Sequence, residues 1–404
     1  MIRPYRPRAV VTGIGVLAAN GTGKDAFWQS LCDGQSGIGP ITLFDASDLK
    51  CQIAGEVKGF DPDEHIDPAL KPRRMGRFTQ LGITAARMAI ADSKLDRKDL
   101  QNTPQIPVVM GVSTNAMDLT TVAPRLHTAV SGVPHAAASA IGYMYDLDTR
   151  LLTISNGCAS SLDAVALAAD LVRGNRTDIA IAGGAEAAIV HYVIASMLKC
   201  RKCSTRNDEP DQASRPFDRD RDFGVMSEGA GVVVIENLEH ALARGVEPYA
   251  EIIGYASHAD PHDAPEGGGL DRAMIEAVAN AGRRMEDIDY VSAHGPSDID
   301  MDRTETKMIK NAFGKRAHEV PVSSIKGSTG CPMGVGGVLQ IIASSMGLKH
   351  GLIPPTANYK NPDPQCDLDY VPGKARMACI EHALVNTHGF GRGNSALVLS
   401  ATED

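Results

Sequence analysis

The chain has 404 residues, 43% of them hydrophobic and 40 of them glycine, a composition typical of an α/β protein with a large core. Its formal net charge of −9 argues against nucleic acid or an anionic membrane as the main partner. We find no apolar run that predicts a membrane span and no signal peptide, and the eight cysteines lack a disulfide framework, so we expect a cytoplasmic protein.

The first strand is predicted at Ala9–Thr12, and the glycines after it have the spacing of a nucleotide-binding loop. Residues Gly13–Ala18 match G-x-G-x-x-A, but the polar stretch 20–23 interrupts the helix that this fingerprint requires. We therefore predict a tight turn at these glycines and a helix over Asp25–Leu31.

Two cysteines and a basic cluster stand out in the first half of the chain but have ordinary explanations. Lys71, Arg73 and Arg74 are as well explained by a solvated face as by a binding site. Cys200 and Cys203 form a single C-x-x-C, and because a zinc site needs a second pair nearby, we expect no metal.

The most informative stretch is Leu151–Leu162, in which an apolar strand pattern turns into an apolar-periodic helix. Cys158 stands at that turn, where the partial positive charge of a helix N-terminus favours a thiolate. Since the thiolate is the attacking form, the position suits covalent acyl chemistry, although a single cysteine is more often a small buried hydrophobe.

Strands and helices alternate along the chain, and the pattern restarts after Gly245, which is expected to cap a helix. Such alternation predicts two similar α/β layers with mainly parallel central strands. Further strands are expected at Ile106–Val112, Asp178–Ala182, Gly229–Glu236, Glu251–Tyr255, Ile288–Ala293, Val320–Ile325, Ala383–Thr387 and Ser395–Ser400, and helices at Arg77–Asp92, Leu270–Ala281 and Thr304–Phe313.

Several reactive side chains follow predicted strands, and the ends of strands are where ligands meet α/β sheets. His294 ends one strand, Lys326 follows another, and Gly389–Gly391 follows a third, while Asp302 and Glu305 lie one turn apart on a predicted helix. Each of these has a structural explanation when taken singly, such as a satisfied buried histidine or a solvated lysine. Together they form a family pattern.

Six motifs carry that pattern in order: Gly157–Leu162, Arg215–Asp220, Ser227–Gly231, Ala293–Gly295, Val322–Lys326 and Asn386–Asn394. With them, nearly the whole chain resembles the condensing enzymes of the thiolase fold, specifically the β-ketoacyl-acyl-carrier-protein synthases of fatty acid and discrete polyketide systems. The resemblance implies two similar βαβαβαββ halves in a five-layered α-β-α-β-α core. Residues 1–245 would hold the nucleophile and surface insertions, and residues 246–404 would hold His294, Lys326 and the gate loop.

The resemblance also implies catalytic roles. Cys158 would take the acyl chain from a carrier thioester, and the backbone N–H groups of Cys158 and Phe390 would form the oxyanion hole. Phe390 resembles the gate that moves before the second substrate enters. His294 resembles the first of two histidines that bind the malonyl thioester carbonyl, with Lys326 and Glu305 as the supporting pair.

The same resemblance implies partners. Arg206, together with Lys71, Arg73 and Arg74, resembles the patch that receives an acidic acyl carrier protein, which brings the phosphopantetheine arm. We therefore expect no resident cofactor. The expected unit is a homodimer, or a heterodimer with a related ketosynthase-like subunit, with no nucleic acid or membrane partner.

The chain departs from the family in the half of the site that handles the extender. Cys331 occupies the place of the second histidine, and a thiol is a weaker hydrogen-bond donor than imidazole. Pro296–Asp298 replaces the Thr-x-Thr that holds pantetheine, His388 replaces a phenylalanine beside the gate, and Arg392 replaces a small glycine. We therefore count Cys331 among the catalytic candidates, and Phe390, His388, Ser297 and Arg392 among the substrate-binding ones.

Three functions remain open from the sequence. In the first, a β-ketoacyl synthase condenses acyl-Cys158 with a malonyl-type carrier thioester by decarboxylative Claisen chemistry in polyketide or specialised fatty acid biosynthesis, with Cys331 or His388 replacing the histidine. In the second, an acyltransferase or cyclase uses acyl-Cys158 without decarboxylation. In the third, the chain is a chain-length-determining partner, but such partners typically lack the nucleophile. The sequence favours the first function, then the second.

Overall fold

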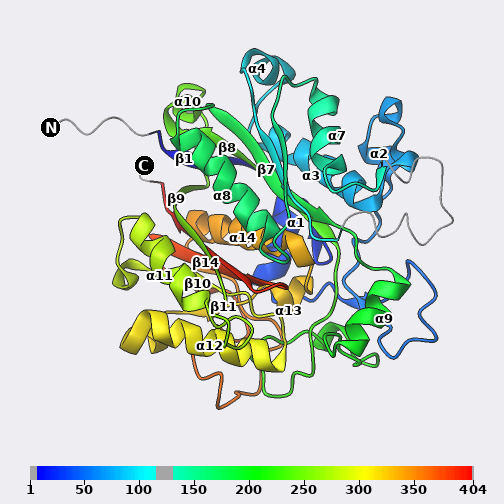
Figure 1. The fold of residues 1–404 in the computed structure, drawn as a ribbon, viewed down its shortest axis with the longest axis vertical. Coiled ribbons are helices and arrows are strands. Elements are labelled where there is room, and N and C mark those ends of the chain that lie inside the picture. Colours follow the sequence, from blue (N-terminus) through cyan, green and yellow to red (C-terminus); the bar gives the residue numbers. More distant parts are fainter. Residues whose placement is uncertain (1–6, 115–130, 403–404) are drawn as a thin grey trace.

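The core of the protein is one mixed sheet of eleven strands, seen in a computed structural model that describes residues 7–114 and 131–402 (Figure 1). Its main strands are β1 (Ala9–Ala18), β5 (Val108–Gly111), β6 (Leu151–Ile154), β7 (Ile179–Glu186), β8 (Gly229–Asn237), β9 (Ala250–Ala259), β10 (Tyr290–Ser292), β11 (Val322–Ser323), β14 (His382–Gly389) and β15 (Gly393–Ser400). Their order is β11-β10-β14-β15-β9-β1-β8-β7-β5-β6, with β2 (Gly21–Thr22) beside β1. The predicted division at residue 245 falls in the connection that leads into β9.

The centre of the sheet is antiparallel, so the expectation of mainly parallel central strands is wrong. β1 runs antiparallel to both β8 and β9, and β7–β8, β9–β15 and β14–β15 are also antiparallel. The parallel pairs involve β5 and β10, toward the two ends of the sheet. One cause is the short connection 390–392 between β14 and β15, because so few residues can join only antiparallel neighbours.

Helices cover the sheet on both faces and also lie between its two halves, as the resemblance predicts for five layers (Figure 1). One pair packs outside the N-terminal strands, one pair lies between the halves, and one pair covers the C-terminal strands. In that order the pairs are α3 (Arg77–Asp92) with α7 (Ala136–Tyr145), α8 (Ser160–Arg173) with α14 (Gly336–His350), and α11 (Leu270–Asn280) with α12 (Ile299–Phe313).

The glycines of the apparent nucleotide fingerprint lie inside β1 rather than in a turn. A Cβ added to Gly13 would lie 2.1 Å from the carbonyl oxygen of Ala89, and one added to Gly15 would lie 1.9 Å from that of Ala85. Both carbonyls belong to α3, so these glycines let the helix pack closely on the strand. The predicted tight turn is therefore wrong, and the helix that follows is α1 (Lys24–Cys32).

Helix α14 is buried along nearly its whole length. Its residues Gly336–Leu348 are all shielded from solvent, and it contacts α8 as well as strands from both halves of the sheet. A helix in that position needs no polar face. It therefore joins the two halves through a shared core.

The remaining elements are short and lie at the periphery or beside the site. Within residues 7–114 and 131–402, no helix combines the length and apolar character of a membrane span. These elements are α2 (Pro62–His65), α4 (Arg97–Asn102), α9 (His191–Lys199), α10 (Leu238–Ala243), α13 (Lys326–Thr329), β3 (Gly39–Pro40), β4 (Ile53–Ala54), β12 (Leu352–Ile353) and β13 (Arg376–Met377).

Candidate active site

Cys158 lies in the turn between β6 and α8, at the base of a small cavity, and its side chain is buried. Gly157 adopts φ +53, and a Cβ there would lie 2.8 Å from the backbone nitrogen of Phe390. Only glycine lets the two backbones approach this closely without strain. The turn is also tied to α8, because the Ser160 hydroxyl donates to the carbonyl of Gly157.

The cavity brings together side chains that are far apart in the sequence. Its volume is about 50 Å³, room for only a few water molecules. Four methionines supply much of the apolar wall, and Phe390, 43% exposed, stands between the cavity and solvent. This position agrees with the predicted gate, whose movement stays a prediction. The predicted residues that line the cavity are Cys158, His294, Cys331, His388 and Phe390.

Cys331 lies beside Cys158, and the two thiols share a hydrogen bond. This contact lowers the pKa of Cys331 to about 6, while the same contact together with burial raises the pKa of Cys158 well above its ordinary value. The expectation of a thiolate on Cys158 from the helix N-terminus alone is therefore incomplete. The two thiols therefore titrate as a pair rather than independently.

The position of Cys331 follows from a short strand-like contact with the segment before β8. Its backbone N–H donates to the carbonyl of Val225 at 2.7 Å, and its carbonyl accepts from the N–H of Ser227 at 3.1 Å. Gly330, at φ +70, makes the turn that brings Cys331 into this contact. The thiol is thus held against the nucleophile rather than free in the cavity.

His294 follows β10 and is buried and held by Lys326. The Lys326 ammonium lies 3.1 Å from Nδ1 of His294 and also donates to the His294 carbonyl. Burial, and then the charge of Lys326, lower the pKa of His294 well below its ordinary value. The ring is therefore neutral, and because Nδ1 accepts from the ammonium, the ring proton is on Nε2.

Glu305, on α12, holds the backbone rather than the ring of His294. Its carboxylate accepts from the N–H groups of His294 and Gly295, both at 2.7 Å, and from the amide of Asn386 at 2.6 Å. Burial raises the pKa of Glu305, and these three donors oppose that effect. Lys326 and Glu305 thus support His294 from two sides.

Two of the predicted substrate-binding residues, Ser297 and Arg392, do not line the cavity, contrary to the prediction. The Ser297 side chain is fully buried, and its hydroxyl accepts from the N–H of Arg215 at 3.0 Å, so its neighbours Pro296 and Asp298 line the cavity instead. Arg392 points away from the cavity and donates to two carbonyls of the loop after β9, those of His262 and Ala264.

Comparisons with known proteins agree with this geometry. Residues 7–241 match the family model described as the N-terminal domain of β-ketoacyl synthase, and residues 249–360 match that of its C-terminal domain. The chain belongs to the β-ketoacyl synthase family. The predicted family is thus confirmed, and the protein is a condensing enzyme of the acyltransferase class.

Named relatives of the synthase come from fatty acid and polyketide systems. The chain is 38% identical to 3-oxoacyl-[acyl-carrier-protein] synthase 2 of Synechocystis sp. over 97% of both chains. It is 37% identical to the tetracenomycin polyketide synthase ketoacyl synthase alpha subunit of Streptomyces glaucescens, over 100% of this chain and 99% of that one.

Solved structures match the synthase over almost its full length. The ishigamide ketosynthase/chain length factor superposes with a TM-score of 0.91 at 31% identity, covering 99% of this chain and 100% of that one. A type II polyketide ketosynthase in complex with its acyl-carrier protein and bound to a hexaketide gives a TM-score of 0.89 at 28% identity, with the same coverage. These matches confirm the thiolase-type fold.

The predicted docking residues of the synthase lie on two segments. Arg206 is half-buried after α9, where its guanidinium donates to the carbonyl of Asp220. Lys71, Arg73 and Arg74 are exposed before α3, and Arg73 pairs with Asp63. Their role in docking stays a prediction.

Sequence reasoning missed three charged residues that line the cavity of the synthase. Lys202 pairs with Asp298 at 2.8 Å and with Glu266 at 3.6 Å, so the three form one ionic cluster in the cavity wall. Glu266 comes from a loop with no motif around it, and Lys202 lies inside the C-x-x-C of Cys200 and Cys203, which was considered only as a metal site. Asp298 carried a local signal, because it caps α12 through its side chain.

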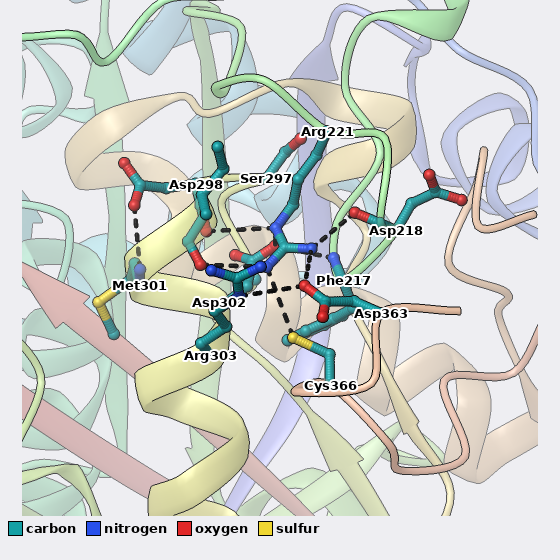
Figure 2. A network of polar contacts seen from close by, with 12 residues as sticks. Phe217, Asp218, Arg221, Ser297, Asp298, Met301, Asp302, Arg303, Asp363 and Cys366 are labelled. Atoms are coloured by element: carbon teal, nitrogen blue, oxygen red, sulfur yellow. Dashed lines mark hydrogen bonds and ion pairs between the residues drawn. The ribbon is translucent and has the colours of Figure 1, made fainter. Parts of the chain in front are cut away.

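A buried ionic network fixes the start of α12 and hence Asp298. Figure 2 shows the guanidinium of Arg221 between Asp302, at 3.1 Å, and Asp363, at 3.0 Å. The same guanidinium donates to the carbonyl of Ile299 at 3.0 Å, and Asp302 accepts from the N–H of Phe217. This network joins the loop before β8, just after the Arg215–Asp220 motif, to α12.

The cysteines outside the cavity do not form a metal cluster in the structure. Cys200 is exposed, whereas Cys203 is buried and shares a thiol hydrogen bond with Cys51. Across the described ranges 7–114 and 131–402, no group of three or more histidine, cysteine and acidic side chains is placed to hold a metal ion.

Proposed function

We propose that this synthase carries an acyl chain on Cys158 and condenses it with a malonyl-type thioester delivered by an acyl carrier protein. The observation that supports this most directly is the one cavity that the Cys158 thiol and the neutral imidazole of His294 both line. The names of the relatives support a place for it in polyketide or specialised fatty acid biosynthesis.

Acylation begins at the paired thiols. The Cys158 sulfur attacks the thioester carbonyl of the acyl carrier as its proton passes to Cys331, and the bond between the carbonyl carbon and the carrier sulfur breaks. The carrier leaves as a thiolate and recovers a proton. The backbone N–H groups of Cys158 and Phe390 are proposed to stabilise the oxyanion of this step.

Condensation uses the other wall of the cavity. The malonyl carboxylate leaves as carbon dioxide, and the electron pair of the broken carbon–carbon bond moves into a thioester enolate, which accepts a hydrogen bond from Nε2–H of His294. The enolate carbon then attacks the acyl-Cys158 carbonyl. Collapse breaks the carbon–sulfur bond, returns Cys158 as a thiolate and leaves a β-ketoacyl thioester on the carrier.

The partners follow from surface features. We propose that Arg206, Lys71, Arg73 and Arg74 receive the carrier, whose phosphopantetheine arm makes a resident cofactor unnecessary. β6 is an end strand of the sheet with Leu151 40% exposed, which supports pairing with a second copy or a related subunit at this edge. The eight free thiols support a reducing compartment such as the cytoplasm.

Intact-mass analysis with an acyl carrier donor and a malonyl carrier tests the proposal. We expect a thioester on Cys158 and release of carbon dioxide, with the mass shift abolished in Cys158→Ala and retained in Cys331→Ala. An acyl group that maps to Cys331 or Cys200 would contradict the assignment of the nucleophile.

One observation favours a second candidate function. A thiol, Cys331, stands where the family has an enolate-stabilising histidine, which is the arrangement expected of an acyltransferase or cyclase that does not decarboxylate. If acyl-Cys158 forms but no malonyl thioester releases carbon dioxide, the acyltransferase or cyclase function is favoured. A protein that is not acylated at all would instead fit a chain-length-determining partner.

A further inference from the structure

The cavity contains a second imidazole that the described mechanism does not use. His388, near the end of β14, is 4% exposed and lines the cavity together with Cys158, His294 and Cys331. The centroids of the His294 and His388 rings lie 6.3 Å apart, and the ring planes are inclined by 83°. A hydrogen bond from a ring nitrogen to oxygen spans about 2.9 Å, so the separation of the rings is compatible with one substrate oxygen between them.

The orientation of His388 is set by Asn394. Nδ1 of His388 lies 2.9 Å from the amide oxygen of Asn394, whose amide nitrogen donates to Asp260 at 2.7 Å and to the carbonyl of His258. The amide oxygen of Asn394 is therefore an acceptor, and Nδ1 of His388 carries a proton. Nε2 is the nitrogen left for chemistry.

Nε2 of His388 is directed toward Glu266, another residue of the cavity wall. The distance to its carboxylate is 3.4 Å, too long for a strong hydrogen bond, and Nε2 has no other hydrogen-bond partner within the described chain. A buried ring nitrogen without a close partner is an unusual arrangement. It leaves room for a substrate oxygen.

The loop that carries Glu266 is fastened to the strand that follows His388. Asp260 accepts from the N–H groups of Gly267 and Gly269, both at 3.0 Å, and from Asn394. At the hairpin tip the Arg392 guanidinium donates to two carbonyls of the same loop. Glu266 is therefore held in place beside His388.

The charges around His388 favour its protonated form. Burial lowers its pKa, but Glu266, Asn394 and the charge of Asp260 outweigh burial and raise the pKa above its ordinary value. Lys202 adds a positive charge to the same wall, 3.6 Å from Glu266, and the other titratable groups of the cavity are His294, Asp298 and the two thiols. The charge of His388 in turn lowers the pKa of His294.

We propose that His388, held by Asn394 and paired with Glu266, donates the second hydrogen bond to the enolate oxygen of the extender. The sequence left open whether Cys331 or His388 replaces the missing histidine. The structure favours His388, because the Cys331 thiol is engaged with Cys158 and is a weak donor. This inference rests on the proposed condensing function and specifies how its decarboxylation step is stabilised.

The imidazoles of His294 and His388 act in different protonation states. As the bond to the carboxylate breaks and its electron pair moves to the enolate oxygen, neutral His294 and protonated His388 each donate from Nε2. A hydrogen bond from a charged donor is roughly twice as strong as a neutral one. His388 keeps its proton through the step, and the negative charge passes to the Cys158 thiolate when the new carbon–carbon bond forms.

The test compares His388→Phe, which restores the aromatic side chain that the family carries there, with His382→Phe at the start of the same strand. On enzyme already acylated at Cys158, we expect His388→Phe to slow carbon dioxide release from malonyl carrier by about 100-fold and His382→Phe to leave it unchanged. Acylation of Cys158 should persist in both variants, which shows that they fold.

The pH dependence of carbon dioxide release shows whether His388 acts as a hydrogen-bond donor or has only a structural role. Because the donor must be protonated, release by the wild type should be fastest below the pKa of His388 and fall as pH rises through it. Glu266→Gln should move this fall to lower pH, and the double variant His388→Phe, Cys331→His should recover release.

Two outcomes of this test have different meanings. If the wild type releases carbon dioxide and His388→Phe matches it in rate and pH profile, the role of His388 is refuted while the condensing function stands. If the acylated wild type releases none with any malonyl thioester, the condensing function itself fails, and this inference with it.

Discussion

Lys326 and His294 form a buried pair in which the cation lies 3.1 Å from Nδ1 of the ring. A positive charge in this position disfavours a second one on the imidazole. The pair therefore contains one charge, not two, and the ring that meets the enolate is a neutral donor. Lys326 is a positioning residue that acts through His294.

Lys326→Met should change the pKa and the orientation of His294. Without the ammonium charge, the pKa of His294 should rise but stay below its ordinary value, because burial remains the larger cause. Carbon dioxide release should fall by about 100-fold as the ring loses its fixed orientation. Histidine NMR titration and a release assay check both effects, with Lys307→Met on the exposed face of α12 as control. An unchanged pKa of His294 would contradict the proposed contact.

Cys331→Ala should remove the thiol ionisation near pH 6. In the wild type the thiol pair should begin to ionise near pH 6, so alkylation by iodoacetamide should rise through that pH. In the variant the low-pKa thiol of Cys331 is gone, and although the contact that raised the pKa of Cys158 is lost with it, burial still raises that pKa, so the inflection should move above the ordinary value for cysteine. Alkylation rates across pH, with peptide mapping, measure this shift, and Cys379→Ala is the exposed control.

Arg206→Glu should weaken the encounter with the carrier protein. We expect KM for the acyl carrier to rise by about 10-fold with little change in kcat, because a surface charge acts mainly on association. The dependence of KM on salt should also become shallower. Arg284→Glu makes the same charge change at another exposed site and should leave KM unchanged. Equal behaviour of the two variants would remove Arg206 from the docking surface.

Arg221→Met should destabilise the protein strongly. It leaves Asp302 and Asp363, both buried, without their shared cation, and breaking such a pair costs about 3 to 5 kcal/mol. Arg219→Met, two residues away, removes only an exposed ion pair at 3.4 Å and should cost less than about 1 kcal/mol. Chemical denaturation of both variants gives the comparison, and similar midpoints would show that the network contributes little.

Much of the fold was predictable where apolar periodicity is clear. Helix α3 spans Arg77–Asp92 as predicted, because one face is polar and the other packs on β1. Helix α14 was missed because it is buried on every side and has no polar stripe to set a period. The glycines of β1 were wrongly predicted to form a turn, because a helix packed closely on a strand and a nucleotide-binding loop both require glycine.

The site was predictable to the extent that its residues follow strands. His294 and Lys326 do so, and the structure brings them together as the strand-end argument implies. Glu266 and Lys202 could not be found this way, because they come from loops and meet the cavity only through the tertiary fold. The thiol pair was also hidden, since Cys158 and Cys331 come from different halves of the chain.

The burial of α14 has a consequence for how the protein is made. Residues up to about Asn237 complete the strands of the first half, yet the helix that covers their inner face together with α8 begins only at Gly336. During synthesis from the N-terminus, the half that carries the nucleophile therefore leaves the ribosome with apolar surface exposed. That apolar surface favours aggregation until α14 has emerged and can cover it.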